Sequence, residues 1–299
     1  MIRILRTLAL LSTIVLLSSC THQASAAGDI DRDGGEVRCG TISSPVEWKY
    51  CITENPGSSN RDILYFFHGL GGNEGQWNKQ RFFRQVRKRW AQTGKEVPVV
   101  VQFSFGKDWF LNEKSKDSVG FMPIVLNNVF PKIEKELVEN FSGKRIIMGF
   151  SMGGFNSIQL VLKHPELFER AALICPAILD FDPYGGKKEI EKRKIAYEQR
   201  TGASERHSKA AVGLIRKFFP TSDQWEQVSP MKICHKYMNE KTPDLLISAN
   251  REDAFGFYVD AERFKDFAIS KGVQVEWQSR PGKHCRQCDW KSTADFLLP

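Results

Sequence analysis

Short apolar runs alternate with longer amphipathic stretches along most of the chain. Segments with the apolar pattern and length of strands occupy 62–67, 97–103, 144–149, 171–175, 245–249 and 273–279. Apolar residues recur with helical spacing in 121–141, 152–164, 258–271 and 289–297, and Pro131 is expected to kink or restart the first of these helices. This alternation predicts an α/β fold, a mostly parallel sheet with helices on both faces. Because the carboxyl ends of such strands meet at one edge, we expect functional residues to follow the strands.

Two segments depart from the alternation. The pattern around 46–52 predicts a β-hairpin before the first of the parallel strands. Residues 181–230 are rich in Lys and Glu, with apolar residues spaced as in two or three helices. We interpret this insertion as a helical cap on the domain. A surface excursion remote from any site is the alternative.

The longest apolar run lies at the N-terminus and indicates export. Arg3 and Arg6 precede an apolar stretch at 7–17, which has signal-peptide length and is too short to span a bilayer comfortably. One interpretation is an ordinary secretory signal, cleaved after Ala26 at a small-x-small site. The mature protein is then expected outside the cytoplasm.

The end of this run, Leu17-Ser18-Ser19-Cys20, resembles the bacterial lipoprotein box. The resemblance implies a signal peptide over 1–19, lipidation of Cys20 and a lipid anchor in the bacterial cell envelope. Thr21 after the cysteine implies sorting to the outer membrane if the organism is Gram-negative. Polar residues 20–35 then form a tether, and 36–299 form the folded domain.

Composition supports a globular domain and excludes several classes. Of 299 residues, 41% are hydrophobic, and 21 Phe and 7 Trp supply more apolar area than disordered chains carry. The net charge is +8, which falls to about +6 when Arg3 and Arg6 leave with the signal peptide. Basic residues cluster at 81–89 and 187–193 with helical spacing, which is typical of solvated helix faces. We therefore expect no nucleic-acid partner.

Seven cysteines leave six once Cys20 is lipidated, an even number that favours disulfide bonds in an oxidising compartment. Pairing by proximity predicts Cys39–Cys51 and Cys285–Cys288, with Cys175 and Cys234 bracketing the insertion. Six cysteines allow fifteen pairings, so proximity is a weak guide. A zinc site needs four ligands and no second pair at metal spacing follows Cys288, so no metal site is predicted.

The segment GFSMGG at 149–154 follows a predicted buried strand and begins a predicted helix. A serine nucleophile needs a sharp strand-to-helix turn that only small neighbours permit, which Gly149 and Gly153 supply. The helix N-terminus then directs its positive dipole end toward a developing oxyanion. Ser151 is therefore the predicted nucleophile.

A serine hydroxyl needs a base, and in this architecture the acid and the histidine follow the serine in that order. His284 alone among the six histidines follows the last strand, in a loop that contains Gly282. Asp253 comes shortly after the strand at 245–249 and is the predicted acid. Three rivals for the acid stay open: Glu252, Asp180 and Asp182.

Two N–H groups must bind the oxyanion of the tetrahedral intermediate. Met152, directly after the nucleophile, is one expected donor. The turn HGLGG at 68–72 is expected to supply the other, with Leu70 favoured and Gly69 or Gly71 as substitutes. His68 is expected to orient this loop by hydrogen bonding, and His68, Gly69 and Gly71 are expected to form part of the substrate-binding site. Aromatic residues are candidates for stacking on a sugar or phenolic ring, with core packing the favoured alternative: Trp77, Trp109, Phe255 and Phe257.

Together, the motifs at 68–72, 149–154, 253–257 (DAFGF) and 281–284 (PGKH) resemble the esterase D-like, or putative esterase, branch of the α/β-hydrolase superfamily. The resemblance covers roughly residue 61 to the C-terminus and implies the α/β-hydrolase fold. It maps the catalytic triad onto Ser151, Asp253 and His284. The cysteine-rich stretch after the histidine and the long charged insertion depart from the family pattern.

The expected function is hydrolysis of carboxylic esters, small or linked to polysaccharide, through an acyl-enzyme on Ser151 and without a cofactor. An acyltransferase or a serine peptidase would use the same triad. A catalytically silent binding protein on a hydrolase scaffold is the non-enzymatic alternative. Substrate identity and oligomeric state lie beyond these patterns.

Overall fold

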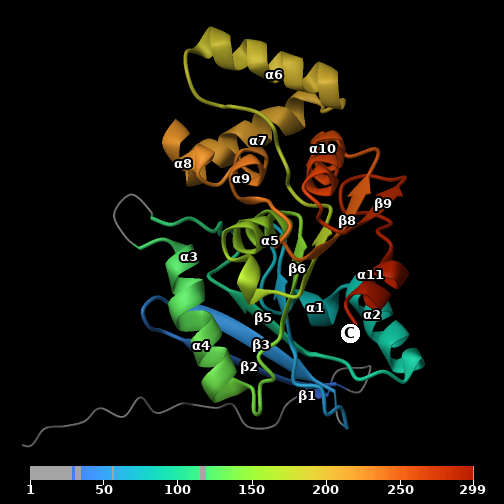
Figure 1. Cartoon of the computed structure of the whole chain (residues 1–299). Helices are drawn as coiled ribbons and strands as arrows, with labels where there is room; N and C mark the ends of the chain where they lie inside the picture. Colours follow the sequence, from blue (N-terminus) through green and yellow to red (C-terminus); the bar gives the residue numbers. More distant parts are fainter. Residues whose placement is uncertain (1–28, 31–34, 56, 115–118, 299) are drawn as a thin grey trace, which may run out of the picture.

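A computed structural model describes residues 29–30, 35–55, 57–114 and 119–298. Within these residues nine strands form one sheet in the order β1-β2-β3-β5-β4-β6-β7-β8-β9 (Figure 1). Their bounds are Asp29–Ile30 (β1), Glu36–Ile42 (β2), Trp48–Glu54 (β3), Ile63–Phe67 (β4), Val99–Ser104 (β5), Arg145–Phe150 (β6), Arg170–Ile174 (β7), Asp244–Asn250 (β8) and Val275–Arg280 (β9). The predicted strands and the early hairpin are confirmed.

Parallel pairing runs from β5 through β4, β6, β7 and β8 to β9, whereas β1, β2 and β3 pair antiparallel at one side. The chain leaves β4 for β5 on one side and returns to β6 on the other, so strand order reverses beside β4. Ligands of open parallel sheets bind at such a switch point. Here Phe67 at the end of β4 is paired with Gly149 of β6, which brings the loop 68–72 beside Ser151.

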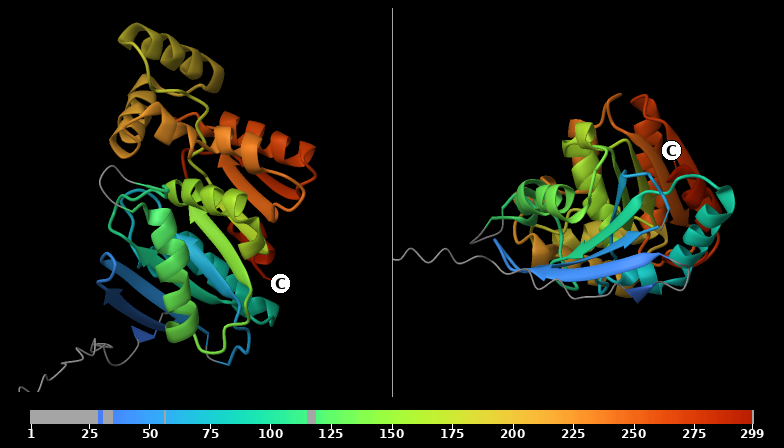
Figure 2. Two further views of the ribbon diagram at one scale, coloured as in Figure 1. Left: turned by 60° about the vertical axis from the view of Figure 1, so that its left-hand side comes forward. Right: turned by 90° about the horizontal axis from the view of Figure 1, so that it is seen from below.

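Helices cover both faces of the sheet (Figures 1 and 2). One face packs against α1 (Gln76–Lys79), α2 (Arg81–Thr93) and α11 (Trp290–Phe296). The other packs against α5 (Met152–Lys163), α9 (Pro230–Tyr237), α10 (Phe257–Ser270) and the helical segment 121–137. A short 3₁₀ turn, η3 (Pro165–Leu167), follows α5. The central strands are buried on both faces, which explains why they appear in the sequence as continuous apolar runs.

The predicted helix at 121–141 is a single run that changes hydrogen-bond pattern along its length. It comprises α3 (Phe121–Ile124), the π-helical segment η1 (Val125–Val129), α4 (Phe130–Lys132) and a second π-helical segment, η2 (Ile133–Leu137). Backbone angles at the junctions stay in the right-handed helical region. Pro131 has no N–H to donate, and the helix accommodates it between the two wider segments.

The insertion 181–230 contains α6 (Lys187–Thr201), α7 (Glu205–Phe218) and α8 (Ser222–Glu226). These three helices form a separate apolar cluster at one end of the molecule, with α6 outermost (Figure 1). Two hydrogen bonds connect this cap to the segment after β8. The Tyr197 hydroxyl donates to Phe255 O at 2.7 Å, and Ser204 N–H donates to Ala254 O at 3.0 Å. The cap is thus joined to the loop that carries Asp253.

The predicted signal peptide over 1–19, Cys20 and most of the tether at 20–35 lie outside the described residues. Among the helices that the structure does describe, none is both long and apolar enough to cross a membrane.

One predicted disulfide is confirmed at the antiparallel end of the sheet. Cys39 and Cys51 face each other in the β2–β3 register and are bonded, closing a loop with a sequence separation of 12. Such a bond stabilises the fold by restricting the unfolded chain.

Replacing both Cys39 and Cys51 by Ala is expected to lower the free energy of unfolding by roughly 2–3 kcal/mol, since the cross-link no longer limits the unfolded ensemble. Denaturant unfolding measures this change. In the sheet, β5 and β4 separate β2 and β3 from β6, the strand that leads into Ser151. The value of kcat/KM should therefore stay at that of the wild type. A large loss of activity in the folded variant would contradict this separation.

Candidate active site

Ser151 occupies a strained turn between β6 and α5. Its backbone has φ +56° and ψ −110°, a conformation that costs energy for any residue with a Cβ atom. A Cβ atom on Gly153 would collide with the Phe67 carbonyl of β4, and one on Gly149 would collide with the Gly153 carbonyl. The turn therefore needs glycine at both positions, and it projects the Ser151 hydroxyl above the sheet edge.

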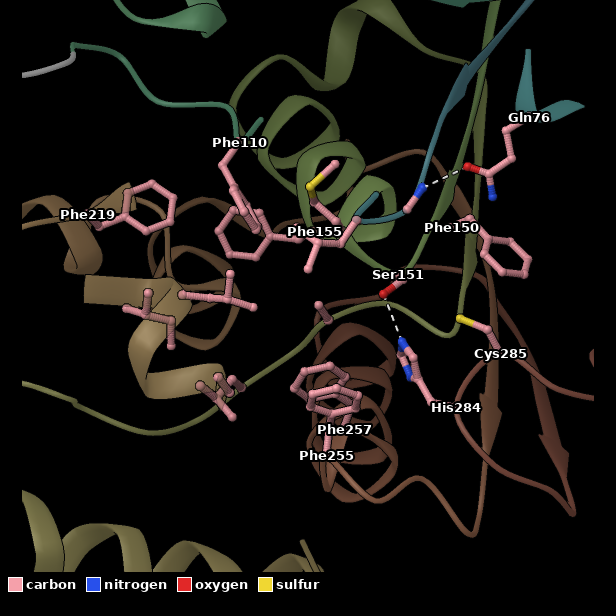
Figure 3. Close-up of a pocket in the computed structure, with 18 of the residues that line it drawn as sticks. Gln76, Phe110, Phe150, Ser151, Phe155, Phe219, Phe255, Phe257, His284 and Cys285 are labelled. Atoms are coloured by element: carbon pink, nitrogen blue, oxygen red, sulfur yellow. Dashed lines mark hydrogen bonds between the residues drawn. The ribbon is translucent and has the colours of Figure 1, made fainter. Parts of the chain in front are cut away.

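Three side chains that are distant in sequence meet at this edge, and Figure 3 shows two of them, Ser151 and His284. Ser151 Oγ lies 2.8 Å from His284 Nε2, and His284 Nδ1 lies 2.6 Å from Asp253 Oδ2. The Asp253 side chain is 2% exposed, and its other oxygen accepts the Phe255 N–H at 2.9 Å. The His284 side chain is 21% exposed. Figure 3 shows the imidazole pointing at the hydroxyl from the loop after β9.

This geometry fixes which imidazole nitrogen carries the proton. A carboxylate only accepts hydrogen bonds, so His284 Nδ1–H must donate to Asp253. In the neutral ring, Nε2 is then an acceptor and receives the Ser151 hydroxyl proton. The arrangement is that of a base poised to deprotonate an alcohol nucleophile.

The rival acids have other partners. Glu252 is exposed, and its N–H donates to Gly282 O. Asp180 forms an ion pair with Arg263, and Asp182 pairs with Arg193 at 3.1 Å. The remaining histidines of the described chain also lie in other contacts: His68, His164, His207 and His235.

The loop after β4 leaves one N–H group unused. Its glycines donate elsewhere: Gly69 to Gln76 Oε1, Gly71 to Lys107 O and Gly72 to Gly69 O. Leu70 N–H has no acceptor among the residues that the structure describes. Met152 is the first residue of α5, so its N–H has no acceptor within the helix. Leu70 and Met152 thus offer two free donors beside Ser151, and both residues line the same pocket as Ser151.

His68 lies beneath this loop and is 1% exposed. Its Nδ1 bonds Gly69 O at 2.9 Å, and Trp109 Nε1–H donates to its Nε2 at 2.8 Å. Burial lowers the pKa of His68. Because Trp109 Nε1–H donates to His68 Nε2, this nitrogen acts as an acceptor and carries no proton. A neutral His68 therefore holds the loop from below. Gly69 lines the pocket, whereas His68 and Gly71 do not.

The disulfide predicted between Cys285 and Cys288 is wrong. Cys285 is bonded to Cys175, which directly follows β7, and Cys288 is a buried free thiol. Cys234, proposed to bracket the insertion with Cys175, is also free and buried. Parallel pairing of β6 and β7 brings Cys175 to the same edge as Ser151. The position of Cys175 at the end of a predicted strand could therefore have indicated its true partner, whereas distance along the sequence could not. The bond anchors the residue next to His284.

Within the described part of the chain, one group of side chains has metal-ligand spacing. The ligand atoms of Cys175, His284 and Cys285 lie within 4.8 Å of one another. The two sulfur atoms are joined in the disulfide, however, and the imidazole is engaged by Ser151 and Asp253. Metal binding needs thiolates, so the oxidised site does not fit a metal ion.

A pocket of about 330 Å³ opens beside Ser151. Residues from the cap and from α5 form one side of it, including Phe155, Phe219 and Trp225. Patterns in the sequence did not single these residues out, because their shared role depends on how the cap folds back. Of the aromatic candidates, Phe255 and Phe257 line the pocket and contact the His284 ring. Trp77 and Trp109 are fully buried core residues.

Comparisons with known proteins agree with this geometry. The model of a family described as "Putative esterase" matches residues 47–230. An endo-1,4-beta-xylanase/feruloyl esterase of Xylanibacter ruminicola is 28% identical over 113 residues, which is 36% of this chain and 15% of that protein. The matched region is thus a small part of this longer relative.

Solved structures share the fold. A ferulic acid esterase superposes with a TM-score of 0.62 at 16% identity, covering 88% of this chain and 94% of the other. An S-formylglutathione hydrolase from Staphylococcus aureus superposes with a TM-score of 0.59 at 16% identity, covering 89% and 99%. The predicted α/β-hydrolase fold is confirmed.

Replacing Cys175 and Cys285 by Ala is expected to lower kcat/KM for 4-nitrophenyl acetate about 10- to 100-fold, because the loop that carries the imidazole loses its anchor and small displacements of a catalytic group are costly. The Cys39/Cys51 double variant is the matched control, since it removes the other disulfide of the described chain. Steady-state kinetics on both variants test the idea. Equal activities would show that the bond does not position His284.

Proposed function

The chain belongs to the putative esterase family, and we propose that it hydrolyses carboxylic esters by acyl transfer through Ser151, His284 and Asp253. Family membership establishes an ester hydrolase. The observation that supports the three roles is the continuous relay of hydrogen bonds, 2.8 Å from Ser151 Oγ to His284 Nε2 and 2.6 Å from His284 Nδ1 to Asp253 Oδ2.

The reaction begins when Ser151 Oγ attacks the acyl carbon and His284 Nε2 takes its proton. The Leu70 and Met152 N–H groups bind the oxyanion, assisted by the positive end of the α5 dipole. His284 then donates the proton to the leaving alcohol, which leaves an acyl-enzyme. Water, deprotonated by the same nitrogen, releases the acid. Asp253 holds the tautomer of His284 and stabilises the imidazolium in both halves of the reaction.

The substrate class is an ester that is either small or linked to a polysaccharide. The curated relative combines a xylanase with a feruloyl esterase, and a similar fold occurs in a ferulic acid esterase. These two likenesses support that substrate class.

Ser151→Ala is expected to lower kcat for 4-nitrophenyl acetate at least about 10⁴-fold, because the site then lacks the nucleophile of the acyl-enzyme. A fluorophosphonate probe should label the wild type and fail to label the variant. Circular dichroism and the melting temperature check that the variant is folded. Activity within tenfold of the wild type would remove Ser151 from this role.

Export with a lipid anchor on Cys20 is part of the proposal. The two disulfides of the described chain support an oxidising compartment. The outer face of α6 consists mainly of charged and polar residues, which are suited to contact with water and not to insertion into the lipid interior.

Cys20→Ala is expected to abolish incorporation of labelled palmitate in a bacterial host and to move the protein from the membrane to the soluble fraction. Mass spectrometry of the mature N-terminus provides the second measurement. A wild-type chain that begins after Ala26 would show that the ordinary secretory signal operates instead.

A further inference from the structure

The pocket beside Ser151 is apolar toward the cap and of mixed character toward the imidazole (Figure 3). Phe110, Phe155 and Phe219 lie toward the cap. His284, Cys285 and Phe150 lie on the other side of the serine. The cap side is completed by Ala211, Ile215 and Trp225. Its side chains are all apolar, whereas the polar residues of the pocket are Ser151, His284, Gln76 and Gln80.

The proposed mechanism determines which side of the pocket holds the alcohol half of an ester and which side holds the acyl half. His284 Nε2 must reach the oxygen of the departing alcohol, so the alcohol half lies on the side of the imidazole. The acyl chain leaves the reacting carbon in the other direction. That direction leads between Phe155 of α5 and the cap helices α7 and α8.

Among the side chains that line the cap side, the one polar group is Trp225 Nε1–H, and it already donates to Phe181 O at 3.0 Å. Within the described part of the pocket, the cap-side lining therefore offers no free side-chain partner to a hydroxyl group of an acyl chain. A buried hydroxyl without a partner is penalised, whereas each buried methylene is favoured.

From this geometry, and resting on the proposed function, we propose that the acyl group is a plain hydrocarbon chain longer than acetyl, bound between Phe155 and the cap. Acyl groups that end in a hydroxyl, such as hydroxylated phenylpropenoyl groups, are discriminated against. The enzyme would thus differ in acyl preference from what the names of its feruloyl esterase relatives state.

Phe110 is the end wall of this acyl pocket. Its ring contacts Phe155 and Phe218, with centroids 5.3 and 4.8 Å apart. On its far side lies a second groove of about 740 Å³, lined by Phe110, Phe121 and Phe218. Only this side chain is shared by the linings of both cavities. The ring therefore limits the length of chain that the pocket accepts.

Hydrolysis of 4-nitrophenyl esters with a constant alcohol measures the acyl preference. We expect kcat/KM to rise about fourfold for each methylene from acetate to butanoate, while the chain is being buried. The 4-hydroxycinnamate should be hydrolysed at least about fivefold more slowly than the cinnamate. A profile that is flat or falls from acetate to butanoate, or a preference for the hydroxylated ester, would overturn the proposal.

Ala211→Leu fills the acyl pocket and is expected to lower the ratio of kcat/KM for hexanoate to kcat/KM for acetate at least about tenfold. Ala210→Leu, on the exposed face of the same helix, is the matched control and should keep the wild-type profile. Phe110→Ala should shift the optimum to longer chains by joining the two cavities. Unchanged profiles in Ala211→Leu and Phe110→Ala would place the acyl chain elsewhere.

The outcomes separate this inference from the proposed function. If the wild type hydrolyses acetate in a Ser151-dependent manner but shows no gain with chain length, the acyl pocket is wrong and the esterase assignment stands. If no ester is hydrolysed by folded wild-type protein and the fluorophosphonate probe fails to react, the proposed catalytic roles fail as well.

Discussion

Parallel pairing of β4, β6, β7 and β8 is the constraint on which the site depends. It aligns four strand ends at one edge, so the segments that follow them are neighbours in space although they are far apart in sequence. These segments carry the Leu70 N–H, the Ser151 hydroxyl, the Cys175 sulfur and the Asp253 carboxylate. The strained turn at Ser151 exists only because β4 and α5 pack closely around Gly153.

Hydrogen bonds, a disulfide and cap contacts together hold the loop that carries His284. Glu252 N–H donates to Gly282 O at 3.1 Å, and the Asn250 side-chain amide donates to Pro281 O at 3.3 Å. The Cys175–Cys285 disulfide ties the loop to the end of β7. Phe255 and Phe257 pack on the imidazole, and the cap holds the Phe255 carbonyl through Tyr197. The cap therefore has two roles that follow from one position: it supports the acid–base pair and it encloses the apolar side of the pocket.

An apolar pocket enclosed by a cap also bears on the chemistry. Excluding water from one side of Ser151 strengthens the hydrogen bonds of the relay and of the oxyanion donors, because their charges lie in a medium of lower dielectric constant. The same exclusion makes unpaired polar groups on a substrate costly. The lower dielectric constant and the proposed selectivity both follow from the burial of Phe155, Phe219 and Trp225.

The sequence by itself determined the fold class, the parallel strands and the glycines around Ser151. These features depend on local sterics and on continuous apolar runs, which are visible in any short window of residues. It also indicated a serine, an acid and a histidine in that order, with Glu252, Asp180 and Asp182 left open as alternative acids because charge alone does not show which carboxylate faces the histidine. Only the tertiary structure decided that Cys285 bonds Cys175 rather than Cys288, since sulfur pairing follows distance in space. The same holds for the pocket beside Ser151, whose walls come from segments that meet only when the cap folds over α5.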